Sequence, residues 1–209
     1  MSTPDRRHII VILDRSGSMN RVREDTEGGL NALLDEQRQV NREGTTVTLV
    51  QFDDEVETVY SGKPLTEIPA FSFQPRGMTA LMDAIGTTVW KEESRIGKLP
   101  PSERPSEVIL VILTDGKDNV SRQYEPGLVR HLLDGVAGRG WTTLFLGANQ
   151  DAFEVAGGLG VSRATTMSFD TSRTQDTLTA TGHMIARGTR TGEFTFSDEE
   201  RSAASRTGE

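Results

Sequence analysis

The most informative part of the chain is an apolar run followed at once by acidic and hydroxyl side chains: Ile9-Ile10-Val11-Ile12-Leu13-Asp14-Arg15-Ser16-Gly17-Ser18. An apolar run rich in β-branched residues and bounded by turn residues is typical of a central strand in a parallel sheet. In open α/β sheets, ligands bind beyond the carboxyl ends of such strands. The sequence therefore places the oxygens of Asp14, Ser16 and Ser18 where a hard divalent cation could bind.

Aspartate and serine also occur in turns and at helix N-caps for local hydrogen-bonding reasons, so this motif alone leaves that interpretation open. Two further segments favour a site. Gly77-Met78-Thr79 lies between a loop and a predicted helix, and Thr114-Asp115-Gly116 ends a second apolar strand. Together these segments offer a set of candidate oxygen ligands: Asp14, Ser16, Ser18, Thr79 and Asp115.

Length and composition predict one globular domain with a tail. The chain has 209 residues, of which 34% are hydrophobic and concentrated in a few runs, enough for one core. We expect the domain to span residues 1–188 and a polar C-terminal tail to span residues 189–209. Within the tail, Ser197-Asp198-Glu199-Glu200 has the pattern of a capping box that opens a short helix.

Charge and cysteine content exclude several classes of partner and site. The formal net charge is -8 and no long run of Lys and Arg occurs, which argues against nucleic acid and anionic membranes as partners. The absence of cysteine excludes disulfides and thiolate metal sites. The short apolar run near the start is too brief for a signal peptide or a membrane span, so we expect a cytoplasmic protein.

The spacing of apolar residues predicts alternating strands and helices. The Asp53-Asp54 turn favours a hairpin whose second strand is an antiparallel edge. This order predicts an α/β fold: a doubly wound, mostly parallel sheet with one antiparallel edge strand and helices on both faces. The predicted strands span 9–13, 45–52, 56–60, 107–113, 141–146 and 162–168, and the predicted helices lie at 22–41, 81–89, 128–136, 149–156 and 174–187.

These motifs resemble those of a known family, the von Willebrand factor type A (vWA) domains, which have a Rossmann-like fold. Asp14-Arg15-Ser16-Gly17-Ser18 is similar to the family's D-x-S-x-S motif, and Thr79 and Asp115 fall at its two other motif positions. The resemblance spans residues 8–187.

The resemblance implies a metal-ion-dependent adhesion site (MIDAS). In such a site Ser16, Ser18 and Thr79 bind Mg²⁺ through hydroxyls, while Asp14 and Asp115 act directly or through bound water; Ca²⁺ and Mn²⁺ are alternatives. Neutral hydroxyl ligands leave the ion short of negative charge, so an Asp or Glu carboxylate of a protein partner can complete its octahedron.

Several polar residues near these motifs have no assigned chemistry. Arg76 and the segment Lys117-Asp118-Asn119 could contact a partner, but we favour a solvated loop. Asp53 is interpreted as a hairpin-turn residue that could lie near the same end of the sheet. The three histidines, His8, His131 and His183, are far apart in sequence, which favours structural or surface roles over a zinc site.

The sequence thus predicts a non-enzymatic, metal-dependent protein-binding module with no catalytic residues and no organic cofactor. The alternative is a metal-assisted hydrolase or phosphoryl-transfer enzyme that uses the same oxygen cluster. Two-metal enzymes use more carboxylates and often histidine, and neither a phosphate-binding loop nor a G-x-S-x-G elbow occurs. A third interpretation is a purely structural ion that relieves the repulsion between Asp14 and Asp115.

Overall fold

The computed structural model describes residues 6–40, 44–148 and 152–205 of the chain. Within these ranges the strands form one sheet in the order β3-β2-β1-β4-β5-β6. All neighbouring strands pair in parallel except β2 and β3, which are antiparallel. This arrangement confirms the predicted sheet. The strands are β1 (Arg7–Asp14), β2 (Thr46–Phe52), β3 (Val56–Pro64), β4 (Glu107–Thr114), β5 (Trp141–Ala148) and β6 (Thr166–Phe169).

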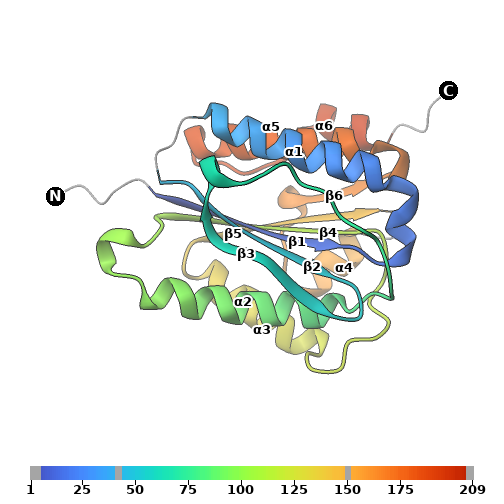
Figure 1. Cartoon of the computed structure of the whole chain (residues 1–209), viewed down its shortest axis with the longest axis horizontal. Helices are drawn as coiled ribbons and strands as arrows, with labels where there is room; N and C mark the ends of the chain where they lie inside the picture. The colour runs from blue at the N-terminus through green and yellow to red at the C-terminus, as the bar shows by residue number, and fades with distance from the viewer. Residues whose placement is uncertain (1–5, 41–43, 149–151, 206–209) are drawn as a thin grey trace.

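Helices cover both faces of the sheet (Figure 1). Helices α1, α5 and α6 pack on one face, and α2, α3 and α4 pack on the other. No helix in the described ranges has the length and apolar character needed to cross a membrane. The helices are α1 (Arg23–Gln39), α2 (Leu81–Lys98), α3 (Pro126–Ala137), α4 (Ala152–Gly158), α5 (Thr174–Thr191) and α6 (Asp198–Ser205).

The side chains of β1 supply both hydrophobic cores. Ile9, Val11 and Leu13 pack with the core under α1 and α5, whereas Ile10 and Ile12 pack with the core under α2 and α3. This follows from the two-residue period of a strand, which sends successive side chains to opposite faces. Each fully buried aliphatic side chain contributes roughly 1.5–3 kcal/mol, so the apolar run is stable only as a central strand.

The order of the strands determines where the site lies. The chain runs from β1 through β2 to the β3 edge and then returns to the other side of β1 with β4. Leu13 is in register with Leu113, and Asp14 with Phe52. The loops after β1, β2 and β4 therefore leave the sheet at the same edge, on the right in Figure 1. This edge is the switch point at which open α/β sheets bind ligands.

Some predicted boundaries differ from those in the structure. A 3-10 helix, Gly17–Val22, precedes α1, so the α-helix starts later than the spacing of apolar residues predicts. The last strand begins at Thr166 rather than Ser162, because the Ser162 side chain accepts the N–H of Ala164 and starts a 3-10 turn instead. The predicted end of the 22–41 helix, at Asn41, and the predicted start of the 149–156 helix, at residues 149–151, lie outside the described residues.

The C-terminal segment packs against the sheet face that α5 covers. Helix α5 continues to Thr191, and the buried Phe196 joins the core under α1 and α5. The Ser197 Oγ accepts the N–H of Glu200 at 3.2 Å, and the Glu200 carboxylate accepts the N–H of Ser197 at 2.7 Å. These are the reciprocal hydrogen bonds of a capping box, and they start α6.

Candidate metal centre

Asp14 closes β1 and is completely buried. Its Oδ1 accepts a hydrogen bond from the N–H of Ser16 at 2.8 Å, and its Oδ2 accepts one from the hydroxyl of Thr114 at 2.6 Å. Burial raises the pKa of the Asp14 carboxyl to about 6; these hydrogen bonds oppose the shift, and the nearby Asp115 adds to it. An ionised Asp14 is therefore unfavourable unless a positive charge lies close to it.

A chain of hydrogen bonds joins the loop after β1 to the end of β4. The Oγ atoms of Ser16 and Ser18 lie 3.0 Å apart, and Ser18 Oγ donates to Asp115 Oδ1 at 2.6 Å. Gly17 begins the 3-10 helix that turns the chain here, between the two serines. Two carboxylates and two hydroxyls from separate strand ends are thus brought together.

Thr79 reaches the same place from the loop before α2. A Cβ atom at Gly116 would lie 3.3 Å from Thr79 Oγ1, so the threonine hydroxyl sits over the backbone next to Asp115. The N–H of Thr79 donates to Asn119 Oδ1 at 3.1 Å, and the N–H of Asn119 donates to the Thr79 carbonyl at 3.0 Å. The structure therefore places Thr79 beside the segment that carries Asp115.

One carboxylate oxygen of this cluster is unsatisfied. Asp115 Oδ2 is buried and has no hydrogen-bond partner among the residues that the structure describes. A buried polar atom without a partner costs roughly 1–3 kcal/mol, and more when it is charged. Hydroxyl and carboxylate oxygens around an orphaned anionic atom form a donor set that fits a hard cation such as Mg²⁺ or Ca²⁺.

The cluster differs from a carboxylate-rich metal site. In the described part of the chain, no three His, Cys, Asp or Glu side chains form a group that could hold a metal ion. A cation here would therefore depend on the hydroxyls of Ser16, Ser18 and Thr79 in addition to the two aspartates. The sequence motifs had already identified these three hydroxyls as candidate ligands.

An ion-pair network around the buried Asp53, beside the cluster, was not predicted from the sequence. Asp53 Oδ2 accepts hydrogen bonds from Arg15 Nε at 2.9 Å and Arg76 Nε at 2.8 Å. Burial opposes ionisation of Asp53, but hydrogen bonds from Arg76, the N–H of Glu55 and Arg15 hold its pKa below the usual value. Asp53 is a turn residue, as predicted, and also joins the loops that carry the motifs. The sequence offered one sign of this network: Arg15 and Arg76 lie within or directly beside two of the motifs. It does not show which carboxylate these arginines contact.

Gly77 allows two of these loops to approach each other closely. Its φ is +70°, in the left-handed region, and a Cβ atom there would lie 2.1 Å from Asp54 Oδ1. Its carbonyl accepts the N–H of Gly17 at 3.1 Å. Only glycine adopts this backbone readily, which explains its position two residues before Thr79.

The segment after Asp115 is a loop with Lys117 and Asn119 exposed, as predicted, and two of its three residues also make specific hydrogen bonds. Asp118 accepts hydrogen bonds from the N–H of Met82 and from the Ser121 hydroxyl, and Asn119 binds the backbone of Thr79. These contacts attach the loop to the start of α2, because that segment offers free backbone N–H groups.

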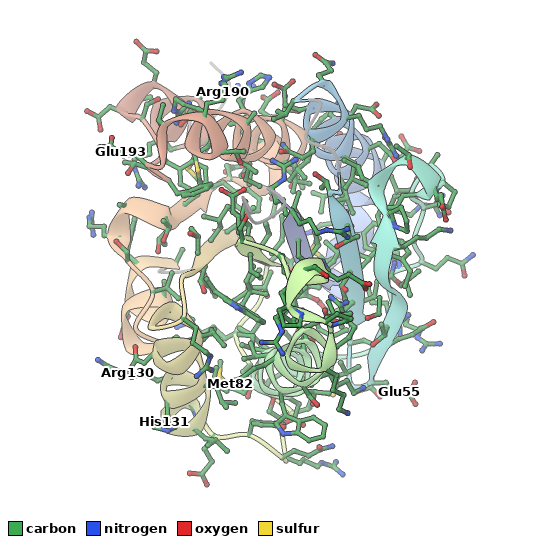
Figure 2. All side chains as sticks on the ribbon, turned by 90° about the vertical axis from the view of Figure 1, so that its left-hand side faces the viewer. Glu55, Met82, Arg130, His131, Arg190 and Glu193 are labelled. Atoms are coloured by element: carbon green, nitrogen blue, oxygen red, sulfur yellow. The ribbon has the colours of Figure 1, made fainter. Side chains whose placement is uncertain are left out.

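The histidines have structural or surface positions, as predicted. His8 is buried, with Nδ1 2.8 Å from Thr46 Oγ1 and Nε2 3.0 Å from Glu92 Oε2. His131 lies on the outer side of α3 beside Arg130 (Figure 2). His183 is on α5, with Nε2 3.8 Å from Glu36 Oε2. They occupy separate elements and do not form a common site.

Comparison with known proteins places the fold. No family model and no curated protein sequence matches this chain. Among solved structures, proximal thread matrix protein 1 from the mussel byssus matches 88% of the chain at 16% identity with a TM-score of 0.58. Manganese-loaded Plasmodium vivax TRAP matches 83% of it at 17% identity with a TM-score of 0.57. A third match is an ArnB paralog, VWA2, from Sulfolobus acidocaldarius, which covers 87% of this chain at 19% identity with a TM-score of 0.52.

This chain has the von Willebrand factor type A fold. The matched region is 47% of the length of the mussel protein, 46% of the Sulfolobus protein and 72% of the Plasmodium protein. One mussel structure has a zinc-occupied MIDAS motif and the Plasmodium structure holds manganese, so proteins with this fold bind divalent metals. At these identities the likeness establishes the fold alone.

Proposed function

We propose that this vWA domain binds a protein partner through a divalent cation held at the candidate metal centre. The observation that carries the proposal is the buried Asp115 Oδ2, which has no hydrogen-bond partner among the described residues. A cation beside it would satisfy this oxygen and would also offset the unfavourable burial of Asp14. The proposed ligands are Asp14, Ser16, Ser18, Thr79 and Asp115.

Mg²⁺ is the cation that we propose, with Ca²⁺ and Mn²⁺ as alternatives. Mg²⁺ takes oxygen ligands in near-octahedral geometry and gives up its water reluctantly. Hydroxyl donors from Ser16, Ser18 and Thr79 suit this chemistry because they replace water without adding charge. The related structures hold zinc or manganese, so they support a divalent metal and leave the choice of ion to the donor chemistry.

The two aspartates have different surroundings and therefore different proposed roles. Both oxygens of Asp14 already accept hydrogen bonds, from Ser16 and from Thr114, so Asp14 orients the serine loop and supplies negative charge. In Asp115, Oδ1 accepts a hydrogen bond from Ser18, and Oδ2 has no hydrogen-bond partner among the described residues. Asp115 is therefore the better candidate for a direct or water-bridged ligand.

The partner in this proposal contributes an Asp or Glu carboxylate. A bound ion would act as a Lewis acid that accepts a further oxygen at its open position. Because most of the proposed ligands are neutral hydroxyls, an anionic oxygen from outside the domain is favoured there. Ser18 is exposed, so the cluster is accessible from the surface at this edge of the sheet.

The competing proposal is a metal-assisted hydrolase or phosphoryl-transfer enzyme. Such enzymes hold their ions with several carboxylates and activate water with a nearby base. Two carboxylates close to the motifs have other hydrogen-bond partners: Asp53 binds two arginines and Asp118 binds the start of α2. These contacts favour the binding module.

Two measurements test the proposal. Titration calorimetry of the metal-free protein with MgCl₂ should detect uptake of an ion that Asp14→Ala abolishes. Immobilised protein should capture partners from a native lysate in Mg²⁺ and release them in EDTA. Capture of the same partners in both conditions, or no uptake of Mg²⁺, Ca²⁺ or Mn²⁺, would contradict the proposal.

The same variant separates binding from a purely structural ion. If the ion binds a partner, Asp14→Ala should abolish the complex while the metal-free variant is at least as stable as the wild type, because a buried carboxylate is gone. A structural ion predicts loss of stability in Mg²⁺ and no further loss of the complex. Mg²⁺-dependent hydrolysis of p-nitrophenyl phosphate that Asp115→Asn abolishes would instead favour the enzyme.

A further inference from the structure

Asn119 holds the main chain of Thr79 by two hydrogen bonds. Its Oδ1 accepts the N–H of Thr79 at 3.1 Å, and its own N–H donates to the Thr79 carbonyl at 3.0 Å. One residue thus satisfies both backbone polar groups of Thr79. Asn119 lies in the loop that starts at Asp115, so this clamp connects two of the segments that supply candidate ligands.

The orientation of the Asn119 carboxamide follows from its partner. A backbone N–H can only donate, so the atom that faces it must be the carboxamide oxygen. Aspartate at this position would keep such an acceptor, whereas alanine would leave the Thr79 N–H without one. The contact can therefore be removed or preserved by single substitutions.

The loop that carries Thr79 needs such a clamp. Residues 68–80 contain no helix or strand, so regular secondary structure does not fix the threonine. The neighbouring Ala80 is held by its N–H to the Asp53 carbonyl at 2.8 Å, and Met78 makes a longer contact of 3.4 Å to Asp54. A hydroxyl that binds Mg²⁺ has to lie about 2.0–2.1 Å from the ion, so a small displacement of Thr79 would remove it as a ligand.

The later part of the loop that follows Asp115 is anchored to helix α2 through Asp83. Both oxygens of Asp83 accept backbone N–H groups, from Arg122 at 2.9 Å and from Gln123 and Tyr124 at 2.8 Å. These contacts fix the far end of the loop, and Asn119 fixes its middle against Thr79. The loop and the start of α2 therefore form one connected unit.

We propose that Asn119 is a positioning residue that sets the affinity of the centre for Mg²⁺ by holding Thr79 over Asp115. This inference rests on the proposed function, because it assumes that Thr79 binds the ion. Asn119 acts through the backbone of Thr79 and does not itself bind the metal.

The test compares Mg²⁺ affinities of single and double variants by calorimetry. Loss of a residue that orients a metal ligand typically lowers affinity roughly 10–100-fold, so Asn119→Ala should bind Mg²⁺ at least tenfold more weakly. Asn119→Asp, which keeps the acceptor, should restore affinity. In a Thr79→Ala background, Asn119→Ala should have no further effect, since the ligand that it positions is already absent.

Asn31 provides a matched control. Its Oδ1 accepts the N–H of Phe71 at 2.8 Å and its Nδ2 donates to the Phe71 carbonyl at 3.1 Å, which is a similar backbone clamp on residues outside the centre. Asn31→Ala should lose stability but keep the Mg²⁺ affinity of the wild type. Hydrogen exchange gives a second readout: the Thr79 amide should exchange faster in Asn119→Ala than in Asn119→Asp.

The outcomes separate this inference from the proposed function. Wild-type affinity in Asn119→Ala, or additive losses in the double variant, would overturn the positioning role while leaving the metal centre intact. Equal losses in Asn31→Ala and Asn119→Ala would also overturn it, because the effect would then be general destabilisation. A wild-type protein that binds no divalent ion would overturn the proposed function and this inference with it.

Discussion

Ser18 Oγ lies 2.6 Å from Asp115 Oδ1, although 97 residues separate the two in the chain. The hydrogen bond joins the loop after β1 to the end of β4, two strands that are adjacent only because the sheet is doubly wound. It leaves Asp115 Oδ2 without a partner in the described part of the chain. The metal centre is therefore a property of the sheet edge rather than of either loop alone.

Asp115→Asn should weaken Mg²⁺ binding at least tenfold, on the order of losses seen when a metal site is perturbed. The substitution keeps the size of the side chain and an acceptor for Ser18 but removes the charge. The measurement is calorimetry at neutral pH.

Asp54→Asn is the matched control for Asp115→Asn. It removes one negative charge from an exposed residue that lies against Gly77 and is not a proposed ligand. Its Mg²⁺ affinity should stay within about threefold of the wild type, since exposed charges are screened by salt. If both variants lost the same amount of Mg²⁺ affinity, the ion would be attracted only by the overall negative charge of the domain and not by Asp115 in particular.

Asp14 should make the metal-free protein less stable as the pH rises. Its pKa is about 6 in the fold against 3.8 ordinarily, so the folded state binds the proton more tightly than the unfolded chain does. The free energy of unfolding should then decrease between about pH 4 and pH 6 and stay reduced above that window, by about 3 kcal/mol at most.

Asp14→Asn should remove this loss. Thr114 Oγ1 also lies 3.0 Å from the Gly116 carbonyl, so its hydroxyl can donate there and accept from the new amide. In EDTA the variant should be about 1–3 kcal/mol more stable than the wild type at pH 7.5, with the difference gone by pH 4. Denaturant melts across this range measure the effect, and a difference that does not depend on pH would refute the assigned cause.

Gly77→Ala should destabilise the protein and disturb the centre. The φ of +70° costs an alanine roughly 1–2 kcal/mol, and its Cβ would collide with Asp54 unless the loop moves. Because Gly77 contacts Gly17 and precedes Thr79, Mg²⁺ affinity should also fall.

Gly97→Ala is the comparison for Gly77→Ala. Gly97 lies in α2, and nothing is within 4 Å of the position of its added Cβ. Alanine there should be neutral or should stabilise by up to about 1 kcal/mol, with unchanged Mg²⁺ affinity. Thermal melts with and without Mg²⁺ compare the two variants, and equal effects would argue against a special role for Gly77.

Phe196→Ala should lower the free energy of unfolding by about 3 kcal/mol or more, the usual loss for a buried phenylalanine. Phe196 is 3% exposed and belongs to the core under α1 and α5. Thr195→Ala, at an exposed neighbour, should change stability by less than about 0.5 kcal/mol. A small effect of Phe196→Ala in urea melts would mean that the domain ends before residue 189, as the polar composition of the tail predicts.

The sequence alone determined the fold class and the candidate ligands. The apolar runs at β1 and β4 are long, β-branched and bounded by turn residues, so their burial on both faces follows from composition. The oxygen side chains directly after them had to lie at one edge of the sheet, because parallel strands end there together. The capping box that starts α6 was also readable, since its hydrogen bonds are local.

Only the tertiary structure decided which polar groups face one another. The Asp53 network with Arg15 and Arg76, the clamp of Asn119 on Thr79 and the unsatisfied Asp115 Oδ2 all depend on loops that meet across the sheet edge. The physical reason is that hydrogen bonding and burial depend on three-dimensional distance and orientation, and residue type and spacing do not fix these between segments that are far apart in the chain.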